Sequence, residues 1–120
     1  MAGLPKQSRL LTKADYNRVF SKSVKVSNSL FLILIHKTSN PHSRLGLVIS
    51  KKVDKRAVQR NRIKRIVRES FRNNVFDIQC DFAVLARGKI TSLSNKEIFD
   101  SINVLWQQAQ SKVKQIRKTK

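Results

Sequence analysis

The sequence predicts a small α+β domain in which helices pack on one side of a short sheet. Two kinds of segment predict this class: unbroken apolar runs of strand length, and longer stretches whose apolar residues recur every three or four positions. The chain has 120 residues, 40% of them hydrophobic, which suits one domain with a single small core. We expect this domain to span residues 1–120, with flexible basic tails at residues 1–11 and 112–120.

A short helix is predicted near the N-terminus. Thr12 followed three residues later by Asp15 is typical of a helix start, with the acidic group in the favourable first turn. Tyr16, Val19 and Phe20 then form an apolar stripe at spacings of three and four residues. The stripe predicts a helix that ends near residues 20–22.

The next segments predict strands. Residues 23–29 fit either a loop or a short strand, and the unbroken apolar run at residues 30–35 predicts a central strand buried on both faces. A turn-forming stretch follows at residues 38–43. We therefore expect residues 44–50 to form the second strand of a hairpin.

The second half of the chain predicts a helix, a strand and a longer helix. The first helix begins at Ala57 and ends at Asn73, residues 81–86 form the strand, and Ser94 with Glu97 forms a capping box that opens the last helix. Each helix has an apolar stripe that we expect to face the core. The stripes are Ile63, Ile66, Val67, Ser70 and Phe71 in the first helix, and Ile98, Phe99, Ile102, Leu105, Trp106, Ala109, Val113 and Ile116 in the second.

The charge of the chain points to a polyanionic partner. The chain has 26 Lys and Arg residues against 7 Asp and Glu, a formal net charge of +19 and a pI near 11.3. Such an excess is typical of proteins that bind nucleic acid or an anionic membrane. The single cysteine excludes an internal disulfide and a Cys-rich zinc site, and three glycines argue against a Gly-rich phosphate loop. No apolar run has the length of a membrane span or a signal peptide, so we expect a cytoplasmic protein.

The first of the two later helices concentrates this charge. Residues 51–72 contain ten Lys and Arg residues, and their only acidic residues are Asp54 and Glu69. At 100° per residue a polar face forms opposite the apolar stripe, with Arg60 at its edge and Arg62 pointing elsewhere. This face consists of Asn61, Lys64, Arg65, Arg68 and Arg72. Since its cations repel one another until phosphates neutralise them, we expect the face to bind nucleic acid.

No set of residues stands out as an enzyme site. His36 and His42 could act as an acid–base pair, but their places near a turn fit solvent-facing side chains. Asp77 and Asp81 could hold a divalent cation, although two carboxylates are a weak metal signal and solvated charges at a strand start fit better. Cys80, next to a buried strand, is typical of a structural residue.

Three aromatic residues have two interpretations. Tyr16 and Phe20 share one face of the first helix, and aromatic residues in that arrangement are most often core, which is what periodicity predicts for Phe20. Tyr16 together with Phe31 could equally form a platform on which nucleobases stack. Periodicity leaves both interpretations of Tyr16 open.

Several segments resemble one family, in the order that the family has them. Residues 60–72, with the sequence RNRIKRIVRESFR, and the preceding Ser50-Lys51-Lys52 and Ala57 are similar to the signature of the bacterial ribonuclease P protein subunit. The aromatic helix of the family resembles residues 15–20, and the strand before its basic helix resembles residues 44–50. Its last strand resembles residues 81–87, and its C-terminal helix resembles residues 93–106. The resemblance covers about residues 8 to 110.

The resemblance implies a fold and a function. The implied fold has a four-stranded sheet and three helices in the order α-β-β-β-α-β-α, is ribosomal-protein-like, and contains a left-handed β-α-β crossover through the basic helix. In the family a large RNA is the catalyst and removes the 5′ leader of precursor tRNA with Mg²⁺ ions. One protein subunit binds that RNA, holds the single-stranded leader, and supplies no catalytic residue and no strong metal site.

The resemblance also assigns residues to two RNA-binding surfaces. The leader cleft would consist of Tyr16, Phe20, Phe31 and Leu32. The basic helix and its approach would contribute Lys51, Lys52, Arg60, Asn61, Arg62, Lys64, Arg65, Arg68 and Arg72. The chain departs from the family at two places. Leu34 stands where some members have tyrosine, and Asp54-Lys55-Arg56 replaces a Gly-Asn turn. Because of the second departure, either Lys51 or Lys52 could correspond to the RNA-binding lysine of the family.

Two other functions fit parts of the pattern. A ribosomal or other structural RNA-binding protein would bind RNA without needing Tyr16 and Phe20 exposed. A protein-only nuclease would cleave the precursor by itself in the presence of magnesium. Binding to a membrane surface does not fit, because the apolar face of the basic helix has no interfacial tryptophan and has the composition of a core.

Overall fold

Three helices and a four-stranded sheet follow one another in the order that the family resemblance implies. The structure is a computed structural model that describes residues 8–118 except 11, 22, 39–41 and 75–78, with side chains up to residue 114. Its elements are α1 (Lys13–Ser21), β1 (Val24–Ser27), β2 (Phe31–Lys37), β3 (Arg44–Val48), α2 (Ala57–Arg72), β4 (Cys80–Ala86), the 3₁₀ turn η2 (Ile90–Ser92) and α3 (Asn95–Lys118). No described helix is both long enough and apolar enough to cross a membrane.

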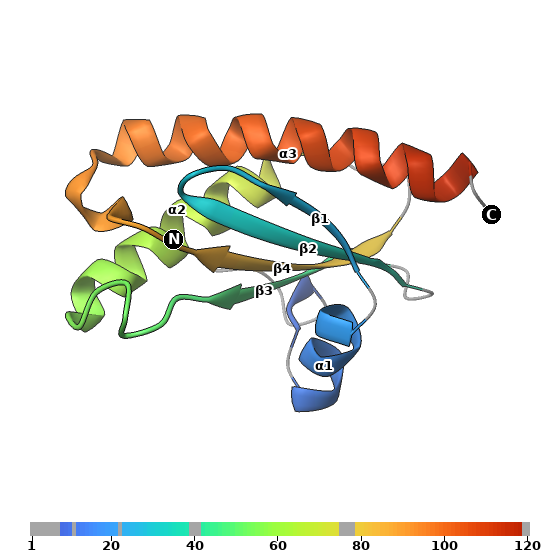
Figure 1. The fold of residues 1–120 in the computed structure, drawn as a ribbon, viewed down its shortest axis with the longest axis horizontal. Coiled ribbons are helices and arrows are strands. Elements are labelled where there is room, and N and C mark those ends of the chain that lie inside the picture. The colour runs from blue at the N-terminus through green and yellow to red at the C-terminus, as the bar shows by residue number, and fades with distance from the viewer. Residues whose placement is uncertain (1–7, 11, 22, 39–41, 75–78, 119–120) are drawn as a thin grey trace.

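The strand order of the sheet is β1-β2-β4-β3 (Figure 1). β2 pairs antiparallel with β1 and β4, whereas β3 pairs in parallel with β4. The predicted hairpin between β2 and residues 44–50 is therefore wrong, because β4 lies between them. Six of the seven residues of β4 are buried, which suits an interior strand, while β3 has half-exposed positions that suit an edge. The connection β3–α2–β4 joins adjacent parallel strands as a crossover, and its left-handedness stays a prediction.

Helices α2 and α3 cover one face of the sheet and enclose the main core (Figure 1). The buried residues of α2 are the five of its predicted stripe. Phe71 of α2, Phe82 of β4 and Trp106 of α3 pack together with ring centroids 5.5–5.8 Å apart. The capping box of α3 is present, with the Ser94 amide donating to Glu97 Oε1 at 3.0 Å and the Glu97 amide to Ser94 Oγ at 3.1 Å.

Helix α1 covers part of the opposite face, so the prediction that all helices lie on one side is wrong (Figure 1). A second, smaller core forms there from Leu10, Val19 of α1, Leu34 of β2 and Ala83 of β4. The short stripe of α1 could not indicate which face it covers, because both faces of the central strands are apolar. The sheet is consequently sandwiched, with a small helix on one side and two longer helices on the other.

Regular structure extends into parts of both chain ends. Arg9 forms a parallel bridge with Leu45, and the Leu10 amide donates a hydrogen bond of 3.1 Å to the Leu45 carbonyl, so this part of the N-terminal arm lies along β3. At the other end α3 continues to Lys118 and so includes the last residue of the predicted stripe, Ile116. The flexibility expected of residues 1–11 and 112–120 stays a prediction.

A buried ion-pair network ties α1 to the sheet. The Arg44 guanidinium donates to both carboxylate oxygens of Asp81, at 2.8 and 2.7 Å, and its Nη1 lies 3.4 Å from the Asp15 carboxylate. Asp81 is fully buried, so the expectation that it is a solvated charge at a strand start is wrong. The hydrogen bond to Asp81 raises the pKa of Arg44. Asp15 also caps α1 through Thr12, so that a single carboxylate joins the helix start to the edge strand.

Tyr16 of α1 lies directly over Gly46 of β3. A Cβ atom added at Gly46 would be 2.6 Å from the Tyr16 ring, 2.7 Å from its hydroxyl and 2.8 Å from Leu10 Cδ1. Real Cβ atoms do not approach other atoms so closely, so the absence of a side chain at Gly46 is what lets α1 pack against the edge strand.

Asp81→Asn is expected to lower the free energy of unfolding by about 3 kcal/mol, because it removes the main counter-charge of the largely buried Arg44 guanidinium and leaves only the more distant Asp15. The control is Asp100→Asn, which breaks an exposed pair with Lys96 and should change the free energy of unfolding much less. Urea unfolding followed by the fluorescence of the buried Trp106 measures both changes. Equal losses in the two variants would contradict a stabilising role for the buried network.

Gly46→Ala is expected to destabilise the chain by about 1–3 kcal/mol through overpacking against Tyr16. The same substitution should cost less when Tyr16 is already alanine, since the ring that it meets is then absent. Urea unfolding of the two single variants and the double variant tests this coupling. A cost of Gly46→Ala that is the same in both backgrounds would show that the close approach of the ring is not the cause.

Candidate nucleic-acid interface

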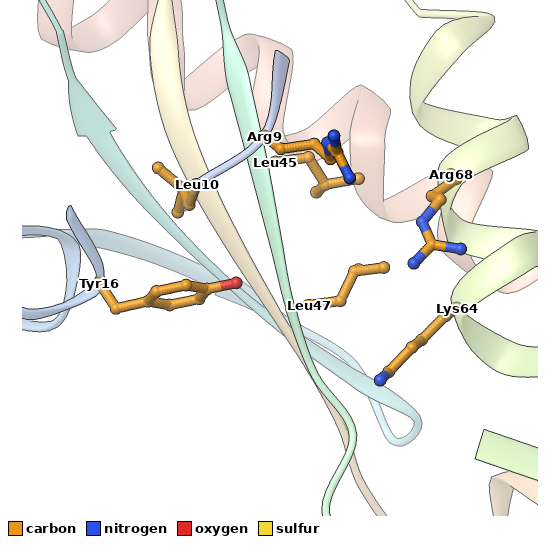
Figure 2. A pocket seen from close by; sticks show the side chains of 7 residues that line it. All are labelled: Arg9, Leu10, Tyr16, Leu45, Leu47, Lys64 and Arg68. Carbon is orange, nitrogen blue, oxygen red and sulfur yellow. The ribbon is translucent and has the colours of Figure 1, made fainter. Parts of the chain in front are cut away.

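A hollow of about 120 Å³ opens at the edge of the sheet between α1 and α2. Figure 2 shows Tyr16 on one side of it, with the hydroxyl pointing toward β3, and Lys64 and Arg68 reaching toward β3 from α2 on the other. The remaining lining residues come from the N-terminal segment and from β3; they are Arg9, Leu10, Leu45 and Leu47. The hollow therefore combines an apolar floor, a phenol and cations from two separate elements.

The cations of α2 that face this hollow have no acidic partner in the described part of the chain. The ion pairs found there involve neither Lys64 nor Arg68, which are one helical turn apart and half-buried. The only acidic residue in α2 is Glu69. Two cations at this spacing repel each other, so an anion placed between α2 and β3 would stabilise the arrangement.

Arg60 and Arg62 have a different environment. Arg60 Nη1 donates to the carbonyls of Asp54 and Lys55, at 3.0 and 2.8 Å, and so holds the loop before α2. The guanidinium of Arg62 hydrogen-bonds Gln59 on its own helix and also the Thr91 carbonyl, the Leu93 carbonyl and Asn95 beyond η2. We therefore assign Arg62 to the fold: its donors are directed at the protein, which does not fit the predicted RNA contact.

The other predicted residues of the basic helix and its approach lie at the surface. Exposed side chains are those of Lys51 and Lys52, in the turn after β3, and of Asn61, Arg65 and Arg72. The Asp54-Lys55-Arg56 turn is closed by the Arg56 guanidinium, which donates to both oxygens of Asp54 at 3.0 and 2.9 Å and lowers the pKa of that carboxyl. Arg56 is thus paired within the turn, whereas Lys51 and Lys52 project from it.

A second part of the interface is the face of the sheet that α1 leaves open. In the row of cross-strand partners under α1, Leu34, Ala83 and Gly46 are buried. In the neighbouring row, which consists of Leu32, Leu85 and Val48, each residue is half-exposed. The aromatic residues of α1 adjoin this face, and their rings are 6.1 Å apart. Phe20 is 44% exposed, so the prediction from periodicity that it is a core residue is wrong. These aromatic and aliphatic side chains form an apolar surface accessible to a ligand.

Phe31 does not belong to this surface, so its predicted place in the cleft is wrong. Side chains of successive strand residues point to opposite faces, and Phe31 lies on the face covered by α3, opposite to that of Leu32. It is fully buried in the main core. The stacking platform of Tyr16 with Phe31 is therefore excluded by geometry, whereas Tyr16, Phe20 and Leu32 remain on one face.

The structure gives the histidines and the cysteine no arrangement for catalysis. His42 is exposed, but His36 is opposite Asp81 in the sheet and half-buried, which corrects the expectation that both face solvent. Burial raises the pKa of the Cys80 thiol to about 11, so this side chain is a poor nucleophile. Among the described residues, no three His, Cys, Asp or Glu side chains gather as metal ligands do; Asp77 lies outside them.

Sequence reasoning missed Arg9, Leu85 and Val48 as parts of the interface. The period-two alternation of a strand would have placed Leu85 on the face opposite to Val84, but only the strand order shows that this face is the one left open. Arg9 gave no signal, because its place follows from a bridge to a residue 36 positions away in the sequence.

Comparisons with known proteins agree with one another. The model of the family described as Ribonuclease P matches residues 4–110. The ribonuclease P protein component of Marinomonas sp. (strain MWYL1) is 44% identical over 110 residues, which are 90% of this chain and 83% of that protein. The component of Marinobacter nauticus (strain ATCC 700491 / DSM 11845 / VT8) is 45% identical over 112 residues, 92% of this chain and 85% of that protein.

Solved structures lead to the same family. The RNase P protein of Staphylococcus aureus superposes with a TM-score of 0.80 at 30% identity, covering 86% of this chain and 95% of that one. The RNase P protein of Thermotoga maritima gives a TM-score of 0.69 at 31% identity, covering 81% of this chain and 94% of that one. Sequence and fold thus agree over nearly the whole length, and the chain belongs to the ribonuclease P protein family.

Proposed function

We propose that this chain binds the catalytic RNA of ribonuclease P and the 5′ leader of precursor tRNA, and that it assists removal of the leader. Family membership implies a role in 5′ maturation of tRNA together with an RNA subunit. The observation that carries the finer proposal is the junction of two surfaces. Lys64 and Arg68 of α2, which have no acidic partner among the described residues, face the hollow that Tyr16 lines, and the open apolar sheet face adjoins the same helix α1.

Single-stranded RNA suits this junction. A leader of variable sequence is bound best through its phosphates and the faces of its bases, because neither depends on base identity. Lys64, Arg68 and Arg9 would bind phosphates, while Phe20 and Leu32 would contact bases on the open sheet face. Double-stranded RNA fits less well, since its bases are stacked inside the helix and cannot reach an apolar surface.

The proposal assigns the cleavage chemistry to the RNA subunit. Asp15, Asp54, Asp81 and Asp100 are engaged in ion pairs, Glu97 caps α3, and Glu69 belongs to no cluster of three possible ligands, so the described carboxylates do not fit a Mg²⁺ site in the protein. Magnesium ions would instead be held by phosphates of the RNA. The protein would contribute by binding and orienting the substrate, with one protein for each RNA.

The proposal is tested by cleavage of a leader-bearing precursor tRNA at low magnesium concentration, with a bacterial ribonuclease P RNA, in the presence and absence of this chain. Cleavage by the RNA should be restored when the chain is added, and the chain alone should not cleave. Cleavage by the chain alone would instead support a protein-only nuclease. Binding of RNA without restored cleavage would support a structural RNA-binding protein.

Lys64→Ala and Arg68→Ala should each reduce the salt dependence of RNA binding. Every phosphate contact adds close to one to the slope of log affinity against log salt, so each loss should lower the slope by about one. Lys114→Ala, an exposed cation on α3, is the control and should leave the slope unchanged. The affinity of each variant for precursor tRNA in complex with the RNA subunit is measured by filter binding over a range of salt. Equal slopes for all three variants would contradict the phosphate assignment.

Phe20→Ala should weaken binding of the reconstituted complex to leader-bearing precursor by about 1–3 kcal/mol, the contribution of one stacked base. Affinity for tRNA without a leader should not change, because the lost contact is with the leader. Val104→Ala removes another exposed apolar side chain and is the matched control. If Phe20→Ala reduces the affinity for both substrates equally, the aromatic residue does not contact the leader.

A further inference from the structure

A second hollow, of about 430 Å³, lies between α2 and the first turns of α3. Its apolar lining is provided by Ile66 and by the half-buried ring of Phe99. Arg65 and Glu69 of α2 and Lys96 of α3 provide charged groups around that lining. We call these five residues the α2–α3 groove.

The α2–α3 groove and the hollow of Figure 2 lie on different flanks of α2. Lys64 and Arg68 line the hollow beside β3, whereas Arg65 and Glu69, the next residue in each case, line the groove. Successive residues of a helix are 100° apart, which accounts for this division. A short single strand held against β3 would therefore leave the groove open to a different ligand.

The charged groups of the groove are available to such a ligand. Arg65 is exposed, and the ion pairs of the described residues do not include it. Lys96 pairs with Asp100 at 2.9 Å, but both side chains are mostly exposed, and exposed pairs of this kind are weak. The wall between them is fixed, because the Arg62 guanidinium donates hydrogen bonds to Asn95, to the Thr91 carbonyl in η2 and to the Leu93 carbonyl just after it.

The chemistry of the groove fits one unpaired ribonucleotide. An aromatic ring at the base of a groove offers a surface for a nucleobase, and cations on both helices can bind the flanking phosphates. Glu69 would repel a bare phosphate, but it can accept a hydrogen bond from an exocyclic amine or a 2′-hydroxyl. The mixture of Phe99, two cations and one carboxylate is therefore better suited to a nucleotide than to a simple anion.

We propose that the α2–α3 groove binds an unpaired nucleotide of the catalytic RNA, so that α2 lies between the leader on one flank and the RNA subunit on the other. This proposal rests on the proposed function. It adds Lys96 and Phe99 of α3 to an RNA interface that the basic helix alone would not predict. The net charge of +19 would attract either RNA or an acidic protein segment. The aromatic ring in the lining favours RNA, because a nucleobase can stack on it.

Lys96→Glu and Phe99→Leu test the groove, with Lys114→Glu as the control for the same change of charge elsewhere on α3. The affinity of the full chain for a bacterial ribonuclease P RNA, without precursor tRNA, is measured by filter binding. Each groove variant should bind about tenfold more weakly than the control, and the preference of the reconstituted complex for leader-bearing over leaderless tRNA should not change. Thermal unfolding identifies any loss due to misfolding of Phe99→Leu, and Lys96→Glu changes only an exposed side chain.

Several outcomes would overturn the proposal. Groove variants that bind the RNA as well as Lys114→Glu does, in a system where the unsubstituted chain binds tightly, would refute the groove and leave the proposed function intact. Loss of the leader preference would show that the groove binds the leader instead. Failure of the unsubstituted chain to bind the RNA would refute the proposed function, and the groove proposal with it.

Tethered cleavage gives an independent readout. Because Cys80 is buried, a thiol-reactive iron chelate would label the Lys96→Cys variant at the new position. Hydroxyl radicals from that position should cut the RNA subunit at one unpaired segment, whereas radicals from Lys114→Cys should not cut there. Cleavage of the tRNA leader, or identical patterns from both positions, would contradict the proposal.

Discussion

The buried pair of Arg44 and Asp81 is the interaction on which the placement of the interface depends. It joins the edge strand β3 to the central strand β4, and through Asp15 it reaches the first turn of α1. A buried charge without its partner is strongly destabilising, so these three elements can pack in few other ways. Since α1 is fixed by its start, Tyr16 lies over Gly46 and faces the cations of α2 across the edge of the sheet.

The second constraint is the division of α2 into an apolar and a cationic face. The stripe from Ile63 to Phe71 is buried against the sheet and α3, and this packing holds together a helix whose exposed charges repel one another. Arg60 and Arg62 relieve part of the repulsion by binding backbone carbonyls of neighbouring loops. Lys64 and Arg68 line the hollow beside β3 and Arg65 lines the groove beside α3, and these are the two flanks that we propose bind RNA.

Local features of the chain could be predicted from sequence, and long-range ones could not. The stripe and limits of α2 and the capping box at Ser94 follow from spacing within one element, and both are confirmed. The position of β4 between β2 and β3 depends on pairings between distant segments, so the turn at residues 38–43 falsely indicated a hairpin. The place of Phe31 in the cleft came from the resemblance, and spacing could not correct it, because in an unbroken apolar run no alternation shows which side chains face the main core.

The family resemblance predicted the number of strands and helices and the two RNA-binding surfaces, which spacing alone could not. The structure then places Phe31 in the main core and directs the Arg62 guanidinium at the protein. Helical periodicity already separated Arg62 from the cationic face, and the hydrogen bonds of its guanidinium agree with that separation.

The central claim is that α1, β3 and α2 form one surface for the leader. Photo-crosslinking from a single modified leader nucleotide in the reconstituted complex tests it most directly. The account predicts crosslinks to peptides from both α1, around Tyr16 and Phe20, and α2, around Lys64 and Arg68. Crosslinks confined to α3, or none to the protein at all, would contradict it.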